Sequence, residues 1–445
     1  MGYWTDGNRV IGVFGLGRSG RAAAALLSQR GFSVTGLDIR VDVQDCPDCN
    51  RIVTGDDMTD CLSSLDGFVI SPGIDPESAL PSAARELGVP VIGEIELAFR
   101  NTDIPVLAIT GSNGKTTTAE WLGYTLSKAG LNVSVAGNTG YPFCRAIIEN
   151  PDADFISLEV SSYQLQTIET FRPLAAAILN ITPDHLQRHG DIEGYINAKA
   201  RIFMNQHDSD LLVLNRDDSG SIPLAGRTSG LEWYFGIGGS FETGAFSEGN
   251  SIYYSDSIST KFVIDIRDIS LSGLHNLSNA LAVVCLAGKA GVQPEQMVCG
   301  LSSFPGVPHR IECIRKYHGV SFVNDSKSTN PDSLKVALES ISEPVTLIAG
   351  GMAKETDYSQ LRSLIADRVK VLILIGDASD MLEKCWSGTA PIFAEGTLDN
   401  ALKRALDQSA VGDLVLLSPG CASFDQYSSF EERGEHFRKL VEDLN

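Results

Sequence analysis

The sequence predicts an α/β protein made of three successive domains. Strand-like apolar runs alternate with helix-like segments along the chain, which is the pattern of βαβ units and mostly parallel sheets. Proline-containing joints at 101–105 and 304–308 separate three such blocks. The length of 445 residues also suits about three domains. We therefore expect domains at 1–101, 102–304 and 305–445.

The first block predicts a Rossmann-like domain. An apolar strand at 10–14 leads into Gly15-Leu16-Gly17-Arg18-Ser19-Gly20, then a helix and a second strand that ends in Asp38. This G-x-G-x-x-G turn, with an acid about 20 residues on, is typical of a diphosphate site at a helix N-terminus. The motif does not separate NAD from another nucleotide diphosphate. A later strand at 67–70 ends in a second turn at Gly73.

The second block carries the clearest chemical signal, Thr110-Gly111-Ser112-Asn113-Gly114-Lys115-Thr116-Thr117 after an apolar strand. A glycine-rich turn between a strand and a helix directs backbone N–H groups and the helix dipole at one point, which suits a polyphosphate. The lysine adds a point charge, and Thr116 a hydroxyl for Mg²⁺. Ile109 stands where G-x-x-x-x-G-K-[ST] begins, so the loop is a shortened variant. We expect a central P-loop ATPase-type domain with a mostly parallel sheet and a small antiparallel excursion within 216–269.

Polar residues follow two further strands of this block. Glu159 ends the run 155–160, and His185 follows the run 175–180. Parallel strands end at one edge, so both are expected near the glycine-rich turn. A carboxylate and the Thr116 hydroxyl are the protein ligands that nucleotide-bound Mg²⁺ usually takes. The alternatives are a solvated acid for Glu159, and a base or a loop-holding residue for His185.

Lys199 lies on the apolar side of the predicted helix 192–203, in line with Ile192, Tyr195, Ile196 and Phe203. Burial would lower its pKa and leave a neutral amine that can take up CO₂ as a carbamate. Periodicity alone favours the other interpretation, in which the side chain extends its ammonium to water. In the predicted helix after Gly273, Asn276 and Asn279 share one face and can pair with an adenine edge. An N-terminal cap is the alternative for Asn276.

The third block predicts a Rossmann-like C-terminal domain. Polar loops follow its strands at 324–330, 350–354 and 418–426, and His309-Arg310 precedes the first strand. Strand ends that carry Lys, Ser and Thr suit a small anionic substrate. Helix caps and turns explain each loop taken singly, but three loops at one edge favour a site.

Bulk properties favour a cytoplasmic protein with small-molecule partners. The formal charge of −21 disfavours nucleic acid and anionic membranes, and no apolar stretch reaches the roughly 18 residues of a membrane span. Nine cysteines are an odd number and suggest free thiols. The spacing of Cys46 and Cys49 suggests redox or zinc chemistry. The absence of a second C-x-x-C favours instead a loop without such chemistry.

Taken together, these sequence motifs resemble those of the Mur ligases over essentially the whole chain. Shared with the wider family are the glycine-rich turn, the stretch 180–185, the stretch 273–280, His309-Arg310 and Asn324-Asp325-Ser326-Lys327. Three segments are more specific to the branch that adds D-glutamate, namely 158–165, 325–330 and 418–426. Ile39 departs from the family, which often has a hydroxyl residue there.

The resemblance implies a role for each matching position. Thr116 and Glu159 would bind the ATP-linked Mg²⁺, and His185 and a carbamylated Lys199 would bind a second Mg²⁺. Asn276 and Asn279 would bind the adenine. Arg310 and Asp325, in addition to the P-loop residues, would bind the rest of ATP. The residues expected to bind the UDP-linked substrate are Gly17, Arg18, Ser19, Asp38, Arg40, Gly73 and Asn138. The residues expected to bind the amino acid are Lys327, Thr329, Lys354, Ser423 and Phe430. Lys115, His185, Lys199 and His309 are the catalytic candidates, and the sequence does not choose which histidine moves a proton.

The activity that the resemblance implies is ATP-dependent amide-bond formation in peptidoglycan precursor synthesis, the pathway behind cell shape and division. D-glutamate would join UDP-N-acetylmuramoyl-L-alanine through an acyl phosphate, with ADP and phosphate released and the enzyme acting as a monomer. One alternative is another Mur-type or folylpolyglutamate-type ligase. The other is an NAD-binding redox protein, which would use the turn at 15–20 and the Cys46/Cys49 pair.

Overall fold

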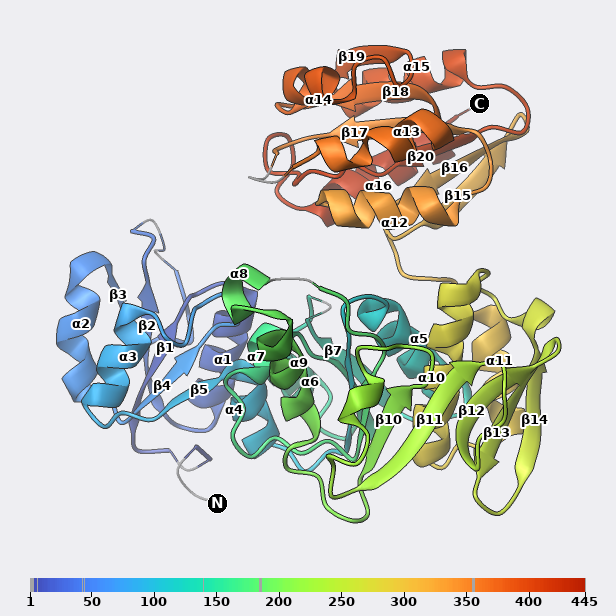
Figure 1. Ribbon diagram of the computed structural model, residues 1–445. Coiled ribbons are helices and arrows are strands. Elements are labelled where there is room, and N and C mark those ends of the chain that lie inside the picture. The colour runs from blue at the N-terminus through green and yellow to red at the C-terminus, as the bar shows by residue number, and fades with distance from the viewer. Residues whose placement is uncertain are drawn as a thin grey trace. The chain divides into compact units, whose positions relative to one another are not determined.

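The computed structural model describes residues 4–5, 7–41, 43, 45–138, 140–183, 186–353 and 357–444 (Figure 1). The chain forms two compact units, Met1–Pro305 and Gly306–Asn445. The first unit contains two sheets and the second contains one, so the predicted α/β architecture is confirmed. The limit predicted near residue 101, within the first unit, stays a prediction.

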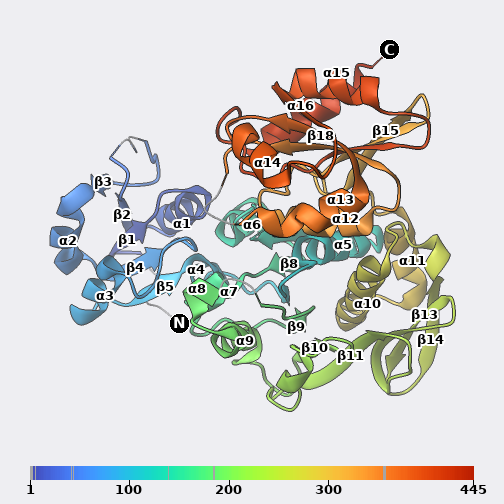
Figure 2. The same cartoon turned by 45° about the horizontal axis from the view of Figure 1, so that its top comes forward.

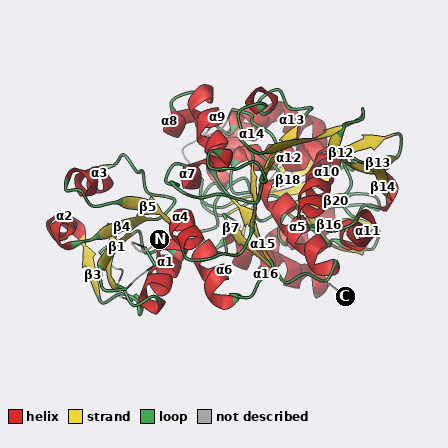
Figure 3. Cartoon of the chain, turned by 90° about the horizontal axis from the view of Figure 1, so that it is seen from below, coloured by secondary structure: helices red, strands yellow, loops and turns green. Residues whose placement is uncertain are grey.

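The first sheet is parallel throughout and has the order β3-β2-β1-β4-β5. Its strands are β1 (Val10–Phe14), β2 (Ser33–Asp38), β3 (Arg51–Thr54), β4 (Gly67–Ile70) and β5 (Val91–Gly93). Its helices are α1 (Arg18–Gln29), α2 (Met58–Cys61), α3 (Ala79–Glu86) and α4 (Glu94–Arg100), with 3₁₀ turns at Gly55–Asp57 and Leu62–Ser64. Helices α1 and α4 cover one face, and α2 and α3 the other (Figure 3). The strand order reverses between β1 and β4, and ligands bind at such a switch point in open α/β sheets.

The glycines of the first turn allow helix α1 to begin close to the strand edge. Gly15 has φ +86°, a region that disfavours other residues. A Cβ on Gly20 would lie 1.9 Å from the carbonyl oxygen of Gly15. Any larger residue at position 20 would therefore push the helix away from the turn.

The second sheet has the order β14-β13-β12-β11-β10-β9-β6-β8-β7. Its strands are β6 (Val106–Thr110), β7 (Val133–Gly137), β8 (Phe155–Glu159), β9 (Ala175–Ile178), β10 (Leu211–Asn215), β11 (Leu231–Ile237), β12 (Thr243–Glu248), β13 (Ser251–Asp256) and β14 (Thr260–Asp265). Its helices are α5 (Lys115–Lys128), α6 (Phe143–Glu149), α7 (Ser162–Leu165), α8 (Leu186–His189), α9 (Ile192–Ala200), α10 (Leu274–Lys289) and α11 (Pro294–Ser303), with 3₁₀ turns at Arg201–Phe203, Ile222–Leu224 and Ile266–Asp268.

The segment predicted as an antiparallel excursion joins this sheet directly. Strands β11 and β12 continue the parallel order from β10, and only the β12–β13 and β13–β14 pairs are antiparallel. The excursion is therefore smaller than the predicted range. Alternating polarity suggests antiparallel pairing, but a strand with one less buried face can also pair in parallel, as β11 does.

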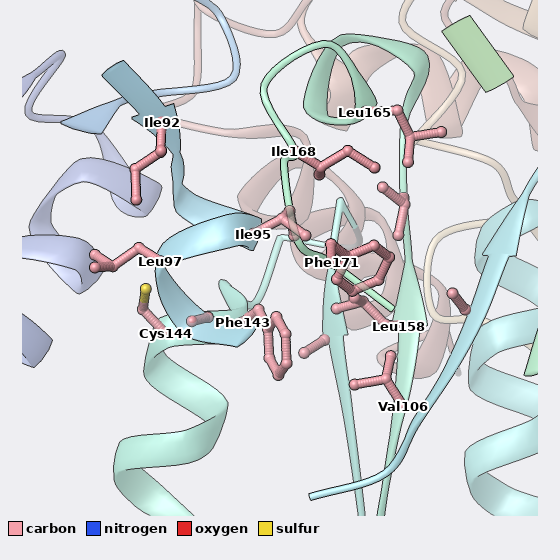
Figure 4. Close-up of a cluster of buried hydrophobic side chains, with 14 of the residues drawn as sticks. Ile92, Ile95, Leu97, Val106, Phe143, Cys144, Leu158, Leu165, Ile168 and Phe171 are labelled. Atoms are coloured by element: carbon pink, nitrogen blue, oxygen red, sulfur yellow. The ribbon is translucent and has the colours of Figure 1, made fainter. Parts of the chain in front are cut away.

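The first and second sheets share one hydrophobic core. Figure 4 shows Ile92, Ile95 and Leu97 from β5 and α4 beside Phe143 and Cys144 of α6, with Val106, Leu158 and Phe171 farther along the cluster. Glu96 adds a polar link, because its carboxylate accepts hydrogen bonds from the backbone N–H groups of Glu169, Thr170 and Phe171. This packing holds the strand ends of the two sheets in a fixed relation.

The third sheet has the order β15-β16-β20-β17-β18-β19 and is parallel except for the β15–β16 pair. Its strands are β15 (Glu312–Tyr317), β16 (Val320–Asn324), β17 (Val345–Gly350), β18 (Val369–Ile375), β19 (Ile392–Gly396) and β20 (Leu414–Leu417). Its helices are α12 (Pro331–Ser340), α13 (Arg362–Arg368), α14 (Ser379–Trp386), α15 (Leu398–Gln408) and α16 (Phe430–Glu442), with a 3₁₀ turn at Ser359–Leu361. Helices α12 to α14 cover one face, and α15 and α16 the other (Figure 2).

No helix in the described ranges is long and apolar enough to cross a membrane.

Candidate active site

The predicted P-loop connects β6 to α5, with Gly114 at the start of the helix. Gly114 has φ +81°, and a Cβ there would meet Oδ1 of Asn279 at 2.5 Å. Asn180 holds the loop from the next strand: its carbonyl oxygen accepts a hydrogen bond from the Ser112 N–H (2.9 Å), and its Oδ1 accepts one from the Asn113 N–H (2.8 Å). The loop is thus fixed from both sides, with the N-terminus of α5 open to an anion.

Lys115 folds back over its own loop. Its ammonium donates hydrogen bonds to the carbonyl oxygens of Gly111 (2.9 Å) and Ser112 (2.8 Å). These contacts place a positive charge within the turn where a polyphosphate would lie.

Lys199 of α9 reaches the same turn. Its side chain is 1% exposed and donates a hydrogen bond to the Gly111 carbonyl oxygen at 2.8 Å. The ammonium also lies 4.5 Å from the ring centre of Tyr195. The inward orientation is confirmed, and the interpretation that the ammonium extends to water is wrong, because the helix packs this face into the core. Two lysines, Lys115 and Lys199, therefore share one backbone acceptor.

Glu159 ends β8 beside the P-loop strand, where it pairs with Ile109. Its side chain is 1% exposed, so the solvated-acid alternative is wrong. Oε1 accepts a hydrogen bond from Nδ2 of Asn138 at 2.9 Å, and Oε2 has no hydrogen-bond partner among the described residues. A buried carboxylate oxygen left without a donor is a suitable hard ligand, so Glu159 and Thr116 fit a Mg²⁺ ion. Within the described ranges, no group of three or more His, Cys, Asp or Glu side chains forms a metal-binding cluster of its own.

Two cavities share Asn138 as a lining residue. A cavity of about 120 Å³ adjoins the P-loop and is lined by Lys115, Asn138, Ser161, Ser162, Tyr163, Tyr195 and Lys199. A second cavity of about 270 Å³ opens at the switch point of the first sheet, and among its lining residues are Gly17, Arg18, Ser19, Gly73 and Asn138. Five residues predicted for the UDP-linked substrate thus line one cavity, and one of them, Asn138, also lines the P-loop cavity.

Asp38 and Arg40 do not line that cavity. Asp38 is buried at the end of β2, and its Oδ2 accepts a hydrogen bond from the Leu16 N–H at 2.8 Å. Its carboxylate also receives the Arg40 guanidinium at 3.1 Å and 3.2 Å. Burial alone would raise the pKa of Asp38, but the hydrogen bonds from Arg40 and Leu16 outweigh it and lower the pKa. Asp38 therefore stays ionised and holds the glycine turn in place.

Asn276 and Asn279 lie on one face of α10, as predicted. Nδ2 of Asn279 lies 3.4 Å from Oδ1 of Asn276, and Asn276 donates to the carbonyl oxygen of Ser272. The residue before the first helical position is Gly273, so the capping alternative for Asn276 is wrong. Asn279 lies against Gly114, which places this pair beside the P-loop.

His309, Arg310 and Asp325 belong to the second unit. The His309 ring is 8% exposed, and its Nδ1 accepts a hydrogen bond from Nδ2 of Asn324 at 2.9 Å. Burial lowers the pKa of His309. Asp325 accepts the Ser418 hydroxyl at 2.7 Å, and burial raises its pKa to about 7, although Ser418 and the charge of Arg310 partly oppose the rise. The catalytic role of His309 stays a prediction.

The loops predicted for the amino acid converge at one sheet edge. Strands β16 and β20 pair side by side, so the loop with Lys327 and Thr329 adjoins the loop with Ser423. The ammonium of Lys327 lies 5.7 Å from the ring centre of Phe430. His185 and Lys354 lie outside the described residues, so their roles stay predictions.

A residue that the sequence did not single out ties these loops together. Arg433 of α16 is 1% exposed and donates hydrogen bonds to the Ser326 hydroxyl (3.0 Å), the Ser326 carbonyl (2.9 Å) and the carbonyls of Cys421 and Ala422. Burial lowers its pKa to about 10, so it remains charged at neutral pH. Nothing in the charged segment around it distinguishes this arginine from a solvent-facing one.

Comparison with known proteins agrees with this geometry. The family descriptions that match are "Mur ligase MurD-like, N-terminal domain" at residues 9–93, "Mur ligase middle domain" at 109–287 and "Mur ligase, glutamate ligase domain" at 309–421. A UDP-N-acetylmuramoylalanine--D-glutamate ligase of Acidobacterium capsulatum is 41% identical over 98% of this chain and 96% of its own length. The same-named protein of Myxococcus xanthus is 41% identical over 99% of both chains.

Solved structures extend the likeness to the fold. UDP-N-acetylmuramate-alanine ligase MurC of Thermotoga maritima gives a TM-score of 0.61 at 17% identity, over 98% of this chain and 99% of that one. MurF of Acinetobacter baumannii gives 0.58 at 20% identity, over 99% and 91%.

The fold and the site therefore define an ATP-dependent ligase, a class in which a P-loop and an acceptor cavity adjoin. The chain belongs to the Mur ligase family, whose members use ATP and Mg²⁺.

Proposed function

We propose that this protein joins the amine of D-glutamate to the carboxylate of UDP-N-acetylmuramoyl-L-alanine, with ATP converted to ADP and phosphate. The observation that carries the proposal is that Asn138 lines both the cavity at the glycine turn and the P-loop cavity. Relatives named for this reaction match nearly the whole chain at 41% identity, which supports D-glutamate over the amino acids of other Mur-type ligases and over folate as acceptor. Family membership likewise favours a UDP-linked ligand over a dinucleotide at the glycine turn.

In this reaction, the acceptor carboxylate attacks the γ-phosphorus of ATP and forms an acyl phosphate, which the amine then converts to the amide. Carboxylate and triphosphate repel each other, so the site must bring negative charges together. The N-terminus of α5 and Lys115 bind the phosphates, and Asn279 and Asn276 receive the adenine from α10. Mg²⁺ held by Thr116 and Glu159 would neutralise charge on the phosphoryl oxygens.

Lys199 is proposed to carry a CO₂-derived carbamate that contributes, with His185, to a second Mg²⁺ site. Its burial and its position at the wall of the 120 Å³ cavity support this assignment. The amine nitrogen already lies at the P-loop, 2.8 Å from the Gly111 carbonyl oxygen, so a carboxylate on that nitrogen would lie among the residues that bind the phosphates.

The acceptor is proposed to bind Gly17, Arg18, Ser19, Gly73 and Asn138, with Asp38 and Arg40 supporting the turn. D-glutamate is proposed to bind the second unit through Lys327, Thr329, Lys354, Ser423 and Phe430, with Arg310 and Asp325 contacting ATP. We further propose that the enzyme acts as a monomer in the cytoplasm. The free cysteines of the described chain support a reducing compartment.

The experiment measures ADP release by the purified protein with the UDP-linked acceptor and a panel of amino acids. D-glutamate should stimulate ADP release, whereas L-alanine, L-glutamate and diamino acids should not. With an oxygen-18 label in the acceptor carboxylate, the released phosphate should carry the label. Unlabelled phosphate would exclude the acyl phosphate, and stimulation by a different amino acid would reassign the substrate.

A further inference from the structure

The chain places two thiols together beside a cavity that the ligase reaction does not use. Cys46 and Cys49 stand on either side of a tight turn, in which the Cys49 N–H donates to the Cys46 carbonyl oxygen at 2.9 Å. Their Sγ atoms are 2.8 Å apart, within about 0.8 Å of the roughly 2.05 Å of a disulfide bond. A bond between them would require little movement of the turn.

The turn is held in position on both sides. Asn50, directly after it, exchanges backbone and side-chain hydrogen bonds with Val34 of β2. Cys46 is buried in the same hydrophobic cluster as Leu16, and Cys49 packs against that cluster. The pairing of the two sulfur atoms is therefore a feature of the folded domain.

Cys46 also lines a cavity of about 520 Å³ between α1, α6 and the turn. Its lining residues include three arginines, Arg18, Arg21 and Arg145, and two acids, Asp48 and Glu149. Arg145 and Glu149 form an ion pair with each other, and the lining carries one more positive than negative charge. This excess of positive charge is notable in a chain with a formal charge of −21. Such a lining favours a small anionic ligand at the Cys46 sulfur.

We propose that Cys46 and Cys49 are a redox modification site that reacts with small anionic disulfides bound in this cavity. Cys46, which lines the cavity, loses its thiol proton, and its sulfur attacks one sulfur of the small disulfide; a mixed disulfide forms and one small thiolate leaves. Cys49 loses its proton and attacks the Cys46 sulfur, which closes the Cys46–Cys49 bond and releases the second small thiolate. The protein loses two electrons and two thiol protons, and the two released thiolates take up the protons.

The order of attack follows from position, because Cys46 lines the cavity. Burial, together with the neighbouring Cys46 thiol, raises the pKa of Cys49 well above its usual range, which keeps Cys49 a thiol until the mixed disulfide has formed. Cys49 then acts as the resolving residue, a common arrangement in redox-sensing pairs. The adduct at Cys46 would lie next to Arg18, which also lines the acceptor cavity.

The test uses the reduced full-length protein and two disulfides of opposite charge, glutathione disulfide and cystamine. Peptide mapping by mass spectrometry should find a Cys46–Cys49 bond, and glutathione disulfide should react several-fold faster than cystamine at low salt, with the difference reduced at high salt. Cys49→Ser should trap one glutathionyl group on Cys46. Cys299→Ser/Cys313→Ser, which removes two exposed thiols, should leave the result unchanged.

Three outcomes would overturn the proposal. The first is glutathionylation at Cys299 or Cys313 with no bond between positions 46 and 49. The second is equal rates with both disulfides, which would remove the role of the cavity. The third is a Cys49→Ser protein that folds with a wild-type circular dichroism spectrum and yet carries no adduct at Cys46. None of these measurements depends on the ligase assay, so they test the site independently of the proposed function.

Discussion

The ammonium of Lys199 donates a hydrogen bond across 2.8 Å to the carbonyl oxygen of Gly111, 88 positions earlier in the chain. Helix α9 thereby contacts a glycine-rich turn that follows a different strand, β6. The contact places the only buried lysine among the described residues directly at the site. The same contact is the reason why replacing Lys199 should affect the site.

Replacing Lys199 should remove activity. Lys199→Ala is expected to lower ADP release about 100-fold or more, the scale of losing a preorganised charged group. Short carboxylates such as acetate should restore part of the rate by supplying the missing anion. In the wild-type protein, ¹³C-labelled bicarbonate should give a carbamate signal by NMR that the variant lacks. Lys128→Ala, on the exposed end of α5, is the control; wild-type activity in Lys199→Ala would contradict the assignment.

The P-loop predicts a specific effect of a methyl group at Gly114. Gly114→Ala should raise the KM for ATP about tenfold or more, because the new Cβ would displace Asn279 as well as strain the backbone. Gly130→Ala is a matched control: Gly130 also has positive φ, +94°, but no atom lies within 4 Å of its Cβ position. That variant should lose about 1 kcal/mol of stability and keep its ATP affinity. Equal KM values would argue against contact between Asn279 and the loop.

Asp325 predicts a pH dependence of stability in the second unit. Its pKa is about 7 when folded and 3.8 in the reference state, with burial as the main cause. Between about pH 4 and pH 7 the folded state holds a proton that the unfolded state has lost, so stability falls as pH rises, by up to about 1.4 kcal/mol per pH unit. Asp325→Asn should remove this decline.

The measurement compares chemical unfolding of the wild type and Asp325→Asn at pH 5 and pH 7.5. The variant should gain stability relative to the wild type at the higher pH. A difference that does not change with pH would show that Asp325 ionises normally in the fold.

Arg433 should support both stability and amino-acid binding. Arg433→Ala would remove the guanidinium donor from the Ser326 hydroxyl and from the carbonyls of Ser326, Cys421 and Ala422, of which Ala422 keeps the Met352 N–H, at a cost of about 3 kcal/mol. Urea unfolding should report this loss, and the KM for D-glutamate should rise more than the KM for ATP. Arg404→Ala, a more exposed arginine paired with Glu395, should change neither. A stable variant with an unchanged D-glutamate KM would show that the loops hold without the guanidinium.

Much of the site could be read from the sequence, because local patterns encode it. The glycine turns, the strand-end Glu159 and the inward stripe that carries Lys199 depend on neighbours within one or two turns of chain. Arg433 could not be found this way, since its partners are carbonyl oxygens of two distant loops. The same limit applies in part to Asp38, because one of its partners, the Leu16 N–H, lies 22 positions earlier in the chain.

Because Asn138 is a lining residue of both cavities, a molecule built in two halves could occupy both at once. The second half would then bind at a high local concentration set by the linker, and affinity would exceed that of either half. A short bridge suits such an inhibitor, because the effective concentration falls as a flexible linker lengthens.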